Sequence, residues 1–491
     1  MEELLDAVDA LARVNRPELF DALTVPEEVS PLLDPFTYMD LKDDSIKGKG
    51  WFATQNLPAG TRLLVAKPIA AVLHWEDEPP ESNNPDEMEA GDDDDDDDDD
   101  ENDEDDDDEA LFSGPEPEPR INELLLVDLL EELLDNKELW FNTLTQLFPR
   151  TNEELAALPA WVCPDDAMFM EVESLLEQLK LVLPAETVTE ISKRLPHIVR
   201  YNILSMETCS ELLSYPGPDG HSSLAGVALY HYPSFFNHSS RPNVNRWALG
   251  DLMFFVTNQD VTAGQELCIS YLEHDVLCES PYRRNSMLRM DFQDGGEEEN
   301  THGRQVDVEE GPDMPVVDTD VQNELMGMNP LERIDAIDEL LQQALGEKGP
   351  ASETMELSDR PGWFRCDVHN LQILKAITLD AVGQSGKALE LWDQAVLFTE
   401  TCLPPADESG VMIRTQAALS ALQTGDWQRA KQHAEIALRT HDLVFGGGVR
   451  FFRRRYRHDF ALKLRPAPSG AAADLLQGKP PFELLWPLES S

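Results

Sequence analysis

Residues 235–243 read FFNHSSRPN, and residues 264–271 read GQELCISY. Between these two segments, residues 252–256 (LMFFV) have the apolar and aromatic composition of a strand. Residues 260–264 form a glycine-ended turn, and residues 266–271 again have strand composition. Short strands therefore link the two segments, and the region from residue 202 to residue 271 is predicted to be rich in β-structure.

A second β-rich region lies far upstream. Residues 46–53 (IKGKGWFA) read as a glycine turn that enters a strand, and residues 62–73 form an extended apolar run with strand composition. Helical patterns then intervene at residues 121–134, 168–183 and 185–195. This order predicts one β domain over residues 38–293, split by a helical insertion over residues 79–199.

The segments on either side of residues 46–73 are not predicted to be β-structure. Residues 1–34 show apolar side chains at helical spacing and predict an N-terminal helix. Residues 80–119 are of low complexity, and residues 92–109 are acidic at every position except Asn102. Because such a run repels itself and cannot collapse, this segment is predicted to be disordered.

The C-terminal part of the sequence is helical. After an acidic linker at residues 294–322, residues 323–445 contain two patterns of helical hairpins, residues 371–398 turning at Gly386 and residues 411–438 turning at Gly425. This region resembles tetratricopeptide repeats, with a looser spacing between turns than about 34 residues. Residues 446–491 read as a tail. Small residues occupy the expected close-packing positions, namely Ala388, Ala395, Ala430, Ala434 and Ala437. The fold class is therefore α+β, with an all-α bundle after the β domain.

The chain is strongly acidic, with a net charge of −58 over 491 residues. This charge opposes direct binding to nucleic acid and suits basic protein partners, although solubility alone would also explain it. The six cysteines lie far apart with no C-x-x-C pair, which is typical of a reducing compartment. The sequence shows no signal peptide and no apolar run of about 20 residues. We expect a monomer without membrane contact, in the cytoplasm, the nucleus or both.

Several motifs together resemble one family, the SET-domain protein lysine methyltransferases. Residues 47–51 (KGKGW) resemble the family's K-G-x-G-hydrophobic turn, and residues 226–239 (GVALYHYPSFFNHS) are similar to its G-V-G-L-Y-P-x-x-S-L-L-N-H-S run. Residues 264–271 resemble its G-E-E-L-x-x-x-Y segment. The resemblance covers residues 38–293 and is greatest to the SET and MYND branch, whose members also end in a tetratricopeptide-like bundle.

The resemblance implies transfer of a methyl group from S-adenosylmethionine to a lysine of a histone or non-histone protein. It implies a catalytic role for Tyr271 and a substrate channel lined by Tyr230 and Phe292. It further implies a cofactor site made by Lys47, Gly48, Gly50, Trp51, Asn202, Asn237 and His238. Plainer alternatives stay open: a hairpin turn at the glycines, a capping role for Asn202, and core packing for the channel aromatics.

The sequence departs from the family in its zinc sites. No Cys and His cluster of a MYND finger is present, and Ser240 replaces the cysteine expected after Asn-His-Ser. The family's C-x-C-x-x-C triplet downstream of the catalytic tyrosine is also missing. Since serine supplies no thiolate, no zinc is expected. What closes the lysine channel is therefore left open.

Two other functions compete with the methyltransferase hypothesis. The first is a catalytically inactive SET and helical-repeat scaffold that binds basic protein partners. The second is an acidic histone chaperone, which rests only on the aspartate run. Binding of S-adenosylmethionine separates the first from an enzyme, and deletion of residues 80–110 separates the second.

Overall fold

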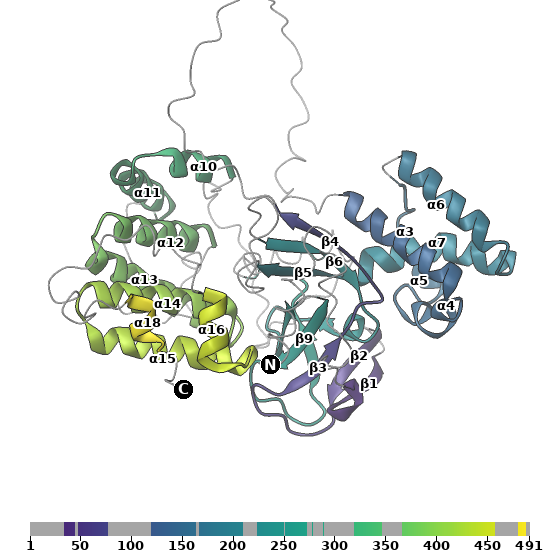
Figure 1. The fold of residues 1–491 in the computed structure, drawn as a ribbon, viewed down its shortest axis with the longest axis horizontal. Coiled ribbons are helices and arrows are strands. Elements are labelled where there is room, and N and C mark those ends of the chain that lie inside the picture. The colour runs from purple at the N-terminus through teal and green to yellow at the C-terminus, as the bar shows by residue number, and fades with distance from the viewer. Residues whose placement is uncertain are drawn as a thin grey trace, which may run out of the picture.

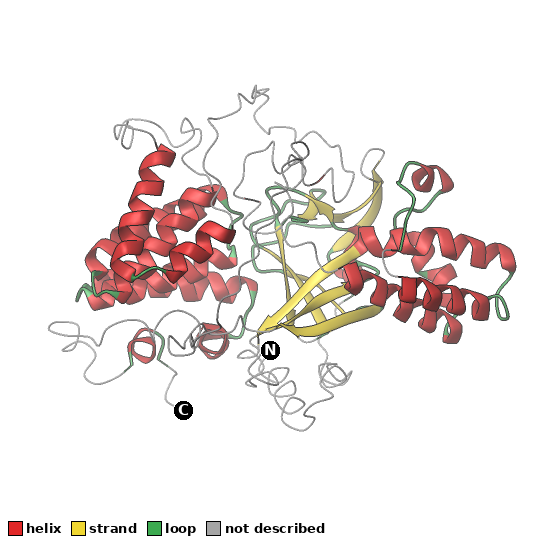
Figure 2. Ribbon diagram, turned by 90° about the horizontal axis from the view of Figure 1, so that it is seen from above, coloured by secondary structure: helices red, strands yellow, loops and turns green. Residues whose placement is uncertain are grey.

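The computed structural model describes residues 34–44, 48–76, 119–163, 166–209, 223–249, 251–272, 319–345, 366–456 and 480–487, together with Leu277 and Leu288. Within these residues the strands form the centre, the helices of the insertion lie on one side and the C-terminal helices on the other (Figure 1). The view from above shows the same arrangement (Figure 2). The predicted order of a split β-rich region followed by helices is therefore confirmed.

Three small sheets make up the β-rich region. The first has the order β1 (Met39–Asp44), β2 (Gly48–Ala53), β10 (Glu266–Ile269) and β7 (Asn237–His238). The second has the order β3 (Arg62–Ala66), β9 (Leu252–Thr257) and β8 (Val244–Leu249), and the third β4 (Ala70–Glu76), β6 (Ser223–Leu229) and β5 (Ile203–Cys209). Each sheet combines strands from both sides of the insertion, so the insertion interrupts a single β domain.

The apolar run at residues 62–73, predicted as one extended segment, is divided between two sheets. Strand β3 ends at Ala66 and β4 begins at Ala70, with Pro68 between them. Proline lacks the N–H that a ladder needs, which explains the break at this point. The chain can therefore leave one sheet and enter another within a few residues.

The insertion is built of helices α3 (Pro119–Asp135), α4 (Glu138–Asn142), α5 (Asn152–Ala156), α6 (Asp166–Leu179) and α7 (Ala185–Asn202), with a 3-10 turn, η3, at Leu144–Gln146. Helix α3 packs against β4 and β6. Its buried leucines Leu125, Leu129 and Leu133 belong to one hydrophobic core with strand residues such as Trp51 of β2 and Phe255 of β9. The insertion is thus an extension of the β domain's core rather than a separate unit.

The C-terminal helices described are α10 (Thr319–Gly327), α11 (Pro330–Leu345), α12 (Cys366–Ala381), α13 (Ser385–Cys402), α14 (Glu408–Gln423), α15 (Trp427–Val444), α16 (Gly448–Tyr456) and α18 (Pro481–Leu485). The turn between α14 and α15 contains Gly425 with φ +81°, as predicted. The turn between α12 and α13 uses Gly383, with φ +78°, and Gly386 lies inside α13. The prediction of a turn at Gly386 is therefore wrong by three residues. A left-handed backbone conformation selects Gly383 instead.

Residues predicted as a C-terminal tail belong in part to the helical region. Phe452 of α16 and Trp486, directly after α18, are buried with Val411 of α14 and Ala434 of α15. The indole of Trp486 donates a hydrogen bond from Nε1 to the carbonyl oxygen of Ala434 at 3.0 Å. The helical region therefore extends past Phe445, because these aromatic side chains complete its core.

The C-terminal helices contact the β domain along β8. The ring of Trp247 lies 5.4 Å from that of Phe445 and 5.9 Å from that of Phe451. Asn245 donates from Nδ2 to the carbonyl oxygen of Ala406 at 3.0 Å. The two regions are thus joined by aromatic packing and by a side-chain hydrogen bond.

Most of three predicted segments lies outside the described residues: residues 1–33 of the N-terminal helix (1–34), residues 80–118 of the acidic run (80–119) and residues 294–318 of the linker (294–322). Residues 319–322, predicted as linker, belong instead to α10. Within the described part of the chain, none of the helices combines the length and the apolar character that crossing a membrane requires.

Candidate active site

Strand β10 brings the two distant motifs together. It pairs in parallel with β7, with Cys268 opposite Asn237 and Ile269 opposite His238. Its other edge pairs antiparallel with β2, with Leu267 opposite Trp51. The glycine turn and the Asn-His segment therefore flank one strand although nearly 190 residues separate them in the chain, and the predicted convergence is confirmed.

Gly50 is the point of closest approach between these motifs. A Cβ atom at this position would lie 2.6 Å from Nδ2 of Asn237 and 2.9 Å from Oε1 of Glu266. Asn237 donates from this Nδ2 to Oε1 of Glu266 at 2.7 Å. Only a residue without a side chain leaves both polar groups in place on this face of β2.

Gly48 lies on the same face of β2, because side chains two residues apart in a strand point in the same direction. It has φ +80°, and a Cβ atom there would lie 2.9 Å from Nη2 of Arg150. The two glycines thus form a strip of bare backbone bounded by Arg150 at one end and Asn237 and Glu266 at the other. Lys47, predicted as part of the cofactor site, lies outside the described residues.

Arg150 comes from the insertion and is held firmly by its own neighbours. Its Nη2 donates to Oε1 of Glu154 at 2.9 Å, and its backbone N–H also donates to that carboxylate. Although burial opposes ionisation of Glu154, these hydrogen bonds and the charge of Arg150 hold the pKa of Glu154 below its usual value. The guanidinium is therefore fixed beside the Gly48 turn.

Trp51 points to the opposite face of β2 and belongs to the core. It is fully buried, and its Nε1 donates to the carbonyl oxygen of Tyr232 at 2.9 Å. Its ring packs against those of Phe235 and Phe236, which directly precede β7. Trp51 therefore fixes β2 relative to the Asn-His segment from behind.

His238 and Tyr271 form the other end of the site. The backbone N–H of Tyr271 donates to Nδ1 of His238 at 3.0 Å, so this nitrogen accepts and carries no proton. The phenol of Tyr271 donates to the carbonyl oxygen of Phe236 at 2.7 Å, and the two rings lie 5.4 Å apart. Both hydrogen bonds tie the end of the β10 segment to the Asn-His segment.

Asn243 completes this frame and was not singled out from the sequence. It is buried and donates from Nδ2 to the carbonyl oxygen of Glu266 at 2.8 Å. Its Oδ1 accepts the backbone N–H of Cys268 at 2.9 Å. The side chain thus pairs with β10 as a strand would. Its place in the R-P-N sequence after Asn-His-Ser was the available signal.

Asn202, predicted to reach the cofactor, instead supports the loop that carries Arg150. Its Nδ2 donates to the carbonyl oxygens of Phe148 at 2.6 Å and Ile198 at 2.9 Å, which uses both amide protons. The neighbouring carbonyl of Pro149 accepts Nε of Arg194 at 3.1 Å. In this structure Asn202 is therefore a positioning residue near the C-terminal end of α7.

Asn202→Ala is expected to lower the free energy of unfolding by about 1–3 kcal/mol, because two carbonyl oxygens lose their partner. Urea unfolding without any ligand measures the loss. Asn142→Ala is the matched control, since its exposed side-chain amide donates to the carboxylate of Glu138 at 3.3 Å on the surface of the same helix. If Asn202→Ala unfolds like the wild type, the positioning role is wrong.

The residues predicted to line a substrate channel have different outcomes. Tyr230 is fully buried, and its hydroxyl donates to Sδ of Met206 at 3.2 Å. Burial raises the pKa of Tyr230, and the charge of Asp251 acts in the same direction. These contacts place Tyr230 in the core and favour the packing alternative over a channel wall. Phe292 lies outside the described residues.

Metal ligands are not gathered in the described part of the chain, where no group of three or more His, Cys, Asp or Glu side chains could hold an ion. Ser240 is half-buried at the position of the expected cysteine. The zinc content of the protein stays a prediction.

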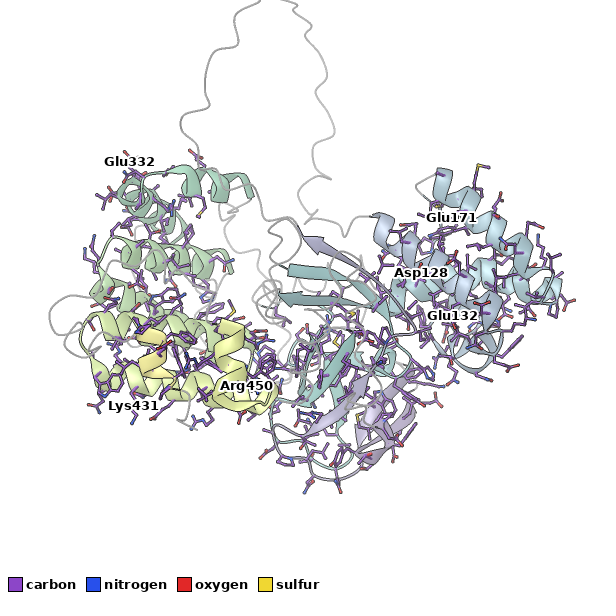
Figure 3. The ribbon with its side chains drawn as sticks, viewed as in Figure 1. Asp128, Glu132, Glu171, Glu332, Lys431 and Arg450 are labelled. Carbon is purple, nitrogen blue, oxygen red and sulfur yellow. The ribbon has the colours of Figure 1, made fainter. Side chains whose placement is uncertain are left out.

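Acidic side chains are exposed on the insertion. Asp128 and Glu132 lie on α3 and Glu171 on α6, as Figure 3 shows. Partial burial raises the pKa of Asp128, and the neighbouring charge of Glu131 adds to the effect. The insertion therefore presents negative charge to solvent.

Comparison with known families agrees with this geometry. Residues 48–272 match the family model of the SET domain, from the first glycine of the turn to the residue after Tyr271. Residues 48–272 are thus similar to a SET domain, and SET domains in general are protein methyltransferases that use S-adenosylmethionine. No curated protein matches the sequence.

Proposed function

We propose that the protein is an S-adenosylmethionine-dependent protein-lysine N-methyltransferase. The observation that carries this proposal is the assembly of Gly48, Gly50, Asn237, His238 and Tyr271 around β10. Glycine at position 50 supports the proposal, because it lets the amide of Asn237 and the carboxylate of Glu266 approach the backbone of β2 where a Cβ atom would displace them. Helices α12 to α15 pair as hairpins, which supports a tetratricopeptide-like C-terminal region and a place near the SET and MYND branch.

Each part of the site has a task in this reaction. The glycine strip and the Asn237 segment would hold the cofactor, which supplies a methyl group on a positively charged sulfur. A lysine amine, with an ordinary pKa of about 10.4, must lose its proton to become nucleophilic. Tyr271 would orient that amine, because its hydroxyl is already fixed in direction by the carbonyl of Phe236.

The substrate class follows from charge. A net charge of −58 and the acidic side chains on the insertion favour a basic, lysine-bearing protein, histone or non-histone, over nucleic acid. We propose a monomer that acts in the cytoplasm, the nucleus or both.

The test measures binding and transfer separately. Calorimetric titration of the full chain with S-adenosylmethionine is expected to show saturable binding at one site. Radiolabelled methyl groups are then expected to appear on lysines in a panel of core histones and lysine-rich proteins. Binding without transfer to any lysine would contradict the enzyme, and no binding at all would favour the scaffold alternative.

A further inference from the structure

Tyr271 lies between two hydrophobic clusters. On one side it packs against the core of the SET domain. On the other side it packs against a smaller cluster of Leu272, Leu277, Leu288, Phe398 and Leu403, each at most 8% exposed. The first three of these residues follow Tyr271 in the chain, whereas Phe398 lies near the end of α13 and Leu403 directly follows it. We call this set the α13 cluster.

Phe398 is held rigidly from the side of the helical region. Its ring stacks on that of His369 of α12, with centroids 3.9 Å apart and planes 20° from parallel. Deeper in α13, the Nε1 of Trp392 donates to Oδ2 of the buried Asp380 at 2.9 Å. The end of α13 is therefore a fixed surface rather than a loose covering.

The same end of α13 is also tied to the SET domain directly. The loop after α13 reaches Ala406, whose carbonyl accepts the amide of Asn245 on β8. Ala406 adopts φ +58°, and Asp407 then caps α14 by accepting the N–H of Ser409 at 2.9 Å. A non-glycine residue in this conformation needs surrounding structure to hold it, which the flanking cap and the Asn245 bond supply.

We propose that α13 braces the active-site tyrosine, with Phe398 and Leu403 as positioning residues for methyl transfer. This inference rests on the proposed function and extends it. Polar bonds to Phe236 and His238 hold Tyr271 from the SET side, and apolar contact with the α13 cluster holds it from the other. Leu272, Leu277 and Leu288, which follow Tyr271 in the chain, thus pack in one hydrophobic cluster with residues from α13 and its end.

The central test is a double-mutant cycle of Leu272→Ala and Phe398→Ala in the full chain. Each single change is expected to lower kcat about tenfold or more, because displacement of a reacting group by about 1 Å is costly. The dissociation constant of S-adenosylmethionine should stay within about twofold. The double variant should be no slower than the worse single variant, since both changes loosen the same cluster beside Tyr271. If the losses of kcat in the two single variants multiply in the double variant, the proposal that α13 braces Tyr271 is wrong.

Matched variants separate bracing from general damage. Leu397→Ala changes the neighbouring residue on α13, which is 46% exposed, and should leave kcat unchanged. Phe398→Leu should restore most of the activity lost in Phe398→Ala. If Phe398→Ala melts the helices, as circular dichroism would show, the Leu272→Ala and Phe398→Leu variants still decide the question. Wild-type turnover in Leu272→Ala would contradict the proposal.

Limited proteolysis tests the brace without measuring methyl transfer, so a failure of the brace can be told apart from a failure of the proposed function. Arg283 and Arg284 are trypsin sites between Leu277 and Leu288 in the sequence. Their cleavage is expected to be several-fold faster in Phe398→Ala than in the wild type and unchanged in Leu397→Ala. Equal cleavage in all three would overturn the brace. A wild type that is protected but does not bind S-adenosylmethionine would instead overturn the proposed function.

Discussion

Tyr271→Phe is expected to lower kcat by about 100–1000-fold, the loss typical of removing one preorganised hydrogen-bonding group from an active site. The dissociation constant of S-adenosylmethionine should change by less than about twofold. The physical reason is that the hydroxyl lies at the junction of the two motifs, fixed by the carbonyl of Phe236 at 2.7 Å. Removal of an interaction made only in the transition state lowers kcat and kcat/KM equally. Single-turnover transfer of labelled methyl groups measures the effect.

Tyr232→Phe is the control for this change. Tyr232 belongs to the aromatic cluster around Trp51 and supports it through a backbone carbonyl, which the substitution keeps. Its activity is expected to stay within about twofold of the wild type. If Tyr271→Phe is as active as this control, Tyr271 serves only in packing and the catalytic assignment is wrong.

Gly50→Ala is expected to raise the dissociation constant of S-adenosylmethionine about tenfold or more. The added methyl group would lie 2.6 Å from Nδ2 of Asn237 and 2.9 Å from Oε1 of Glu266, so both side chains must move. Overpacking of this kind costs about 1–3 kcal/mol, and a tenfold change in affinity corresponds to about 1.4 kcal/mol. Titration calorimetry on the folded variant measures the loss.

The matched control is Gly386→Ala, the same substitution at a site in α13 with no atom within 4 Å of the new Cβ. Alanine is favoured over glycine inside a helix, so this variant should fold well and bind as the wild type does. A folded Gly50→Ala protein with unchanged affinity would show that this face of β2 does not hold the cofactor.

Much of the site was predictable because its residues lie in short local motifs. The glycine turn at residues 47–51 and the segments at residues 235–243 and 264–271 each combine a particular backbone conformation with particular polar side chains. Such combinations depend on near neighbours and are visible in the sequence. The positions of Asn202 and Tyr230 are not determined by local sequence in this way, because a single residue outside a dense motif has many structural uses.

Other members of the site left almost no signal in the sequence. Arg150 comes from the helical insertion, and its contact with Gly48 depends on the loop held by Asn202 and Arg194. Phe398 joins the same cluster as Leu272 from a helix more than one hundred residues downstream. Contacts of this kind follow from how whole elements pack, which no local pattern encodes.

The order of the elements, the split β domain and the motif residues are readable in the amino-acid sequence, since periodicity, turn chemistry and motif spacing are local properties. Three arrangements appear only in the folded protein: β10 lies between β2 and β7, the insertion shares the core of the β domain, and α13 packs beside Tyr271. Those arrangements form when strand edges far apart in the chain pair by hydrogen bonds and distant apolar faces pack together. Their free energy comes from long-range burial and hydrogen bonding rather than from the conformational preferences of any one segment.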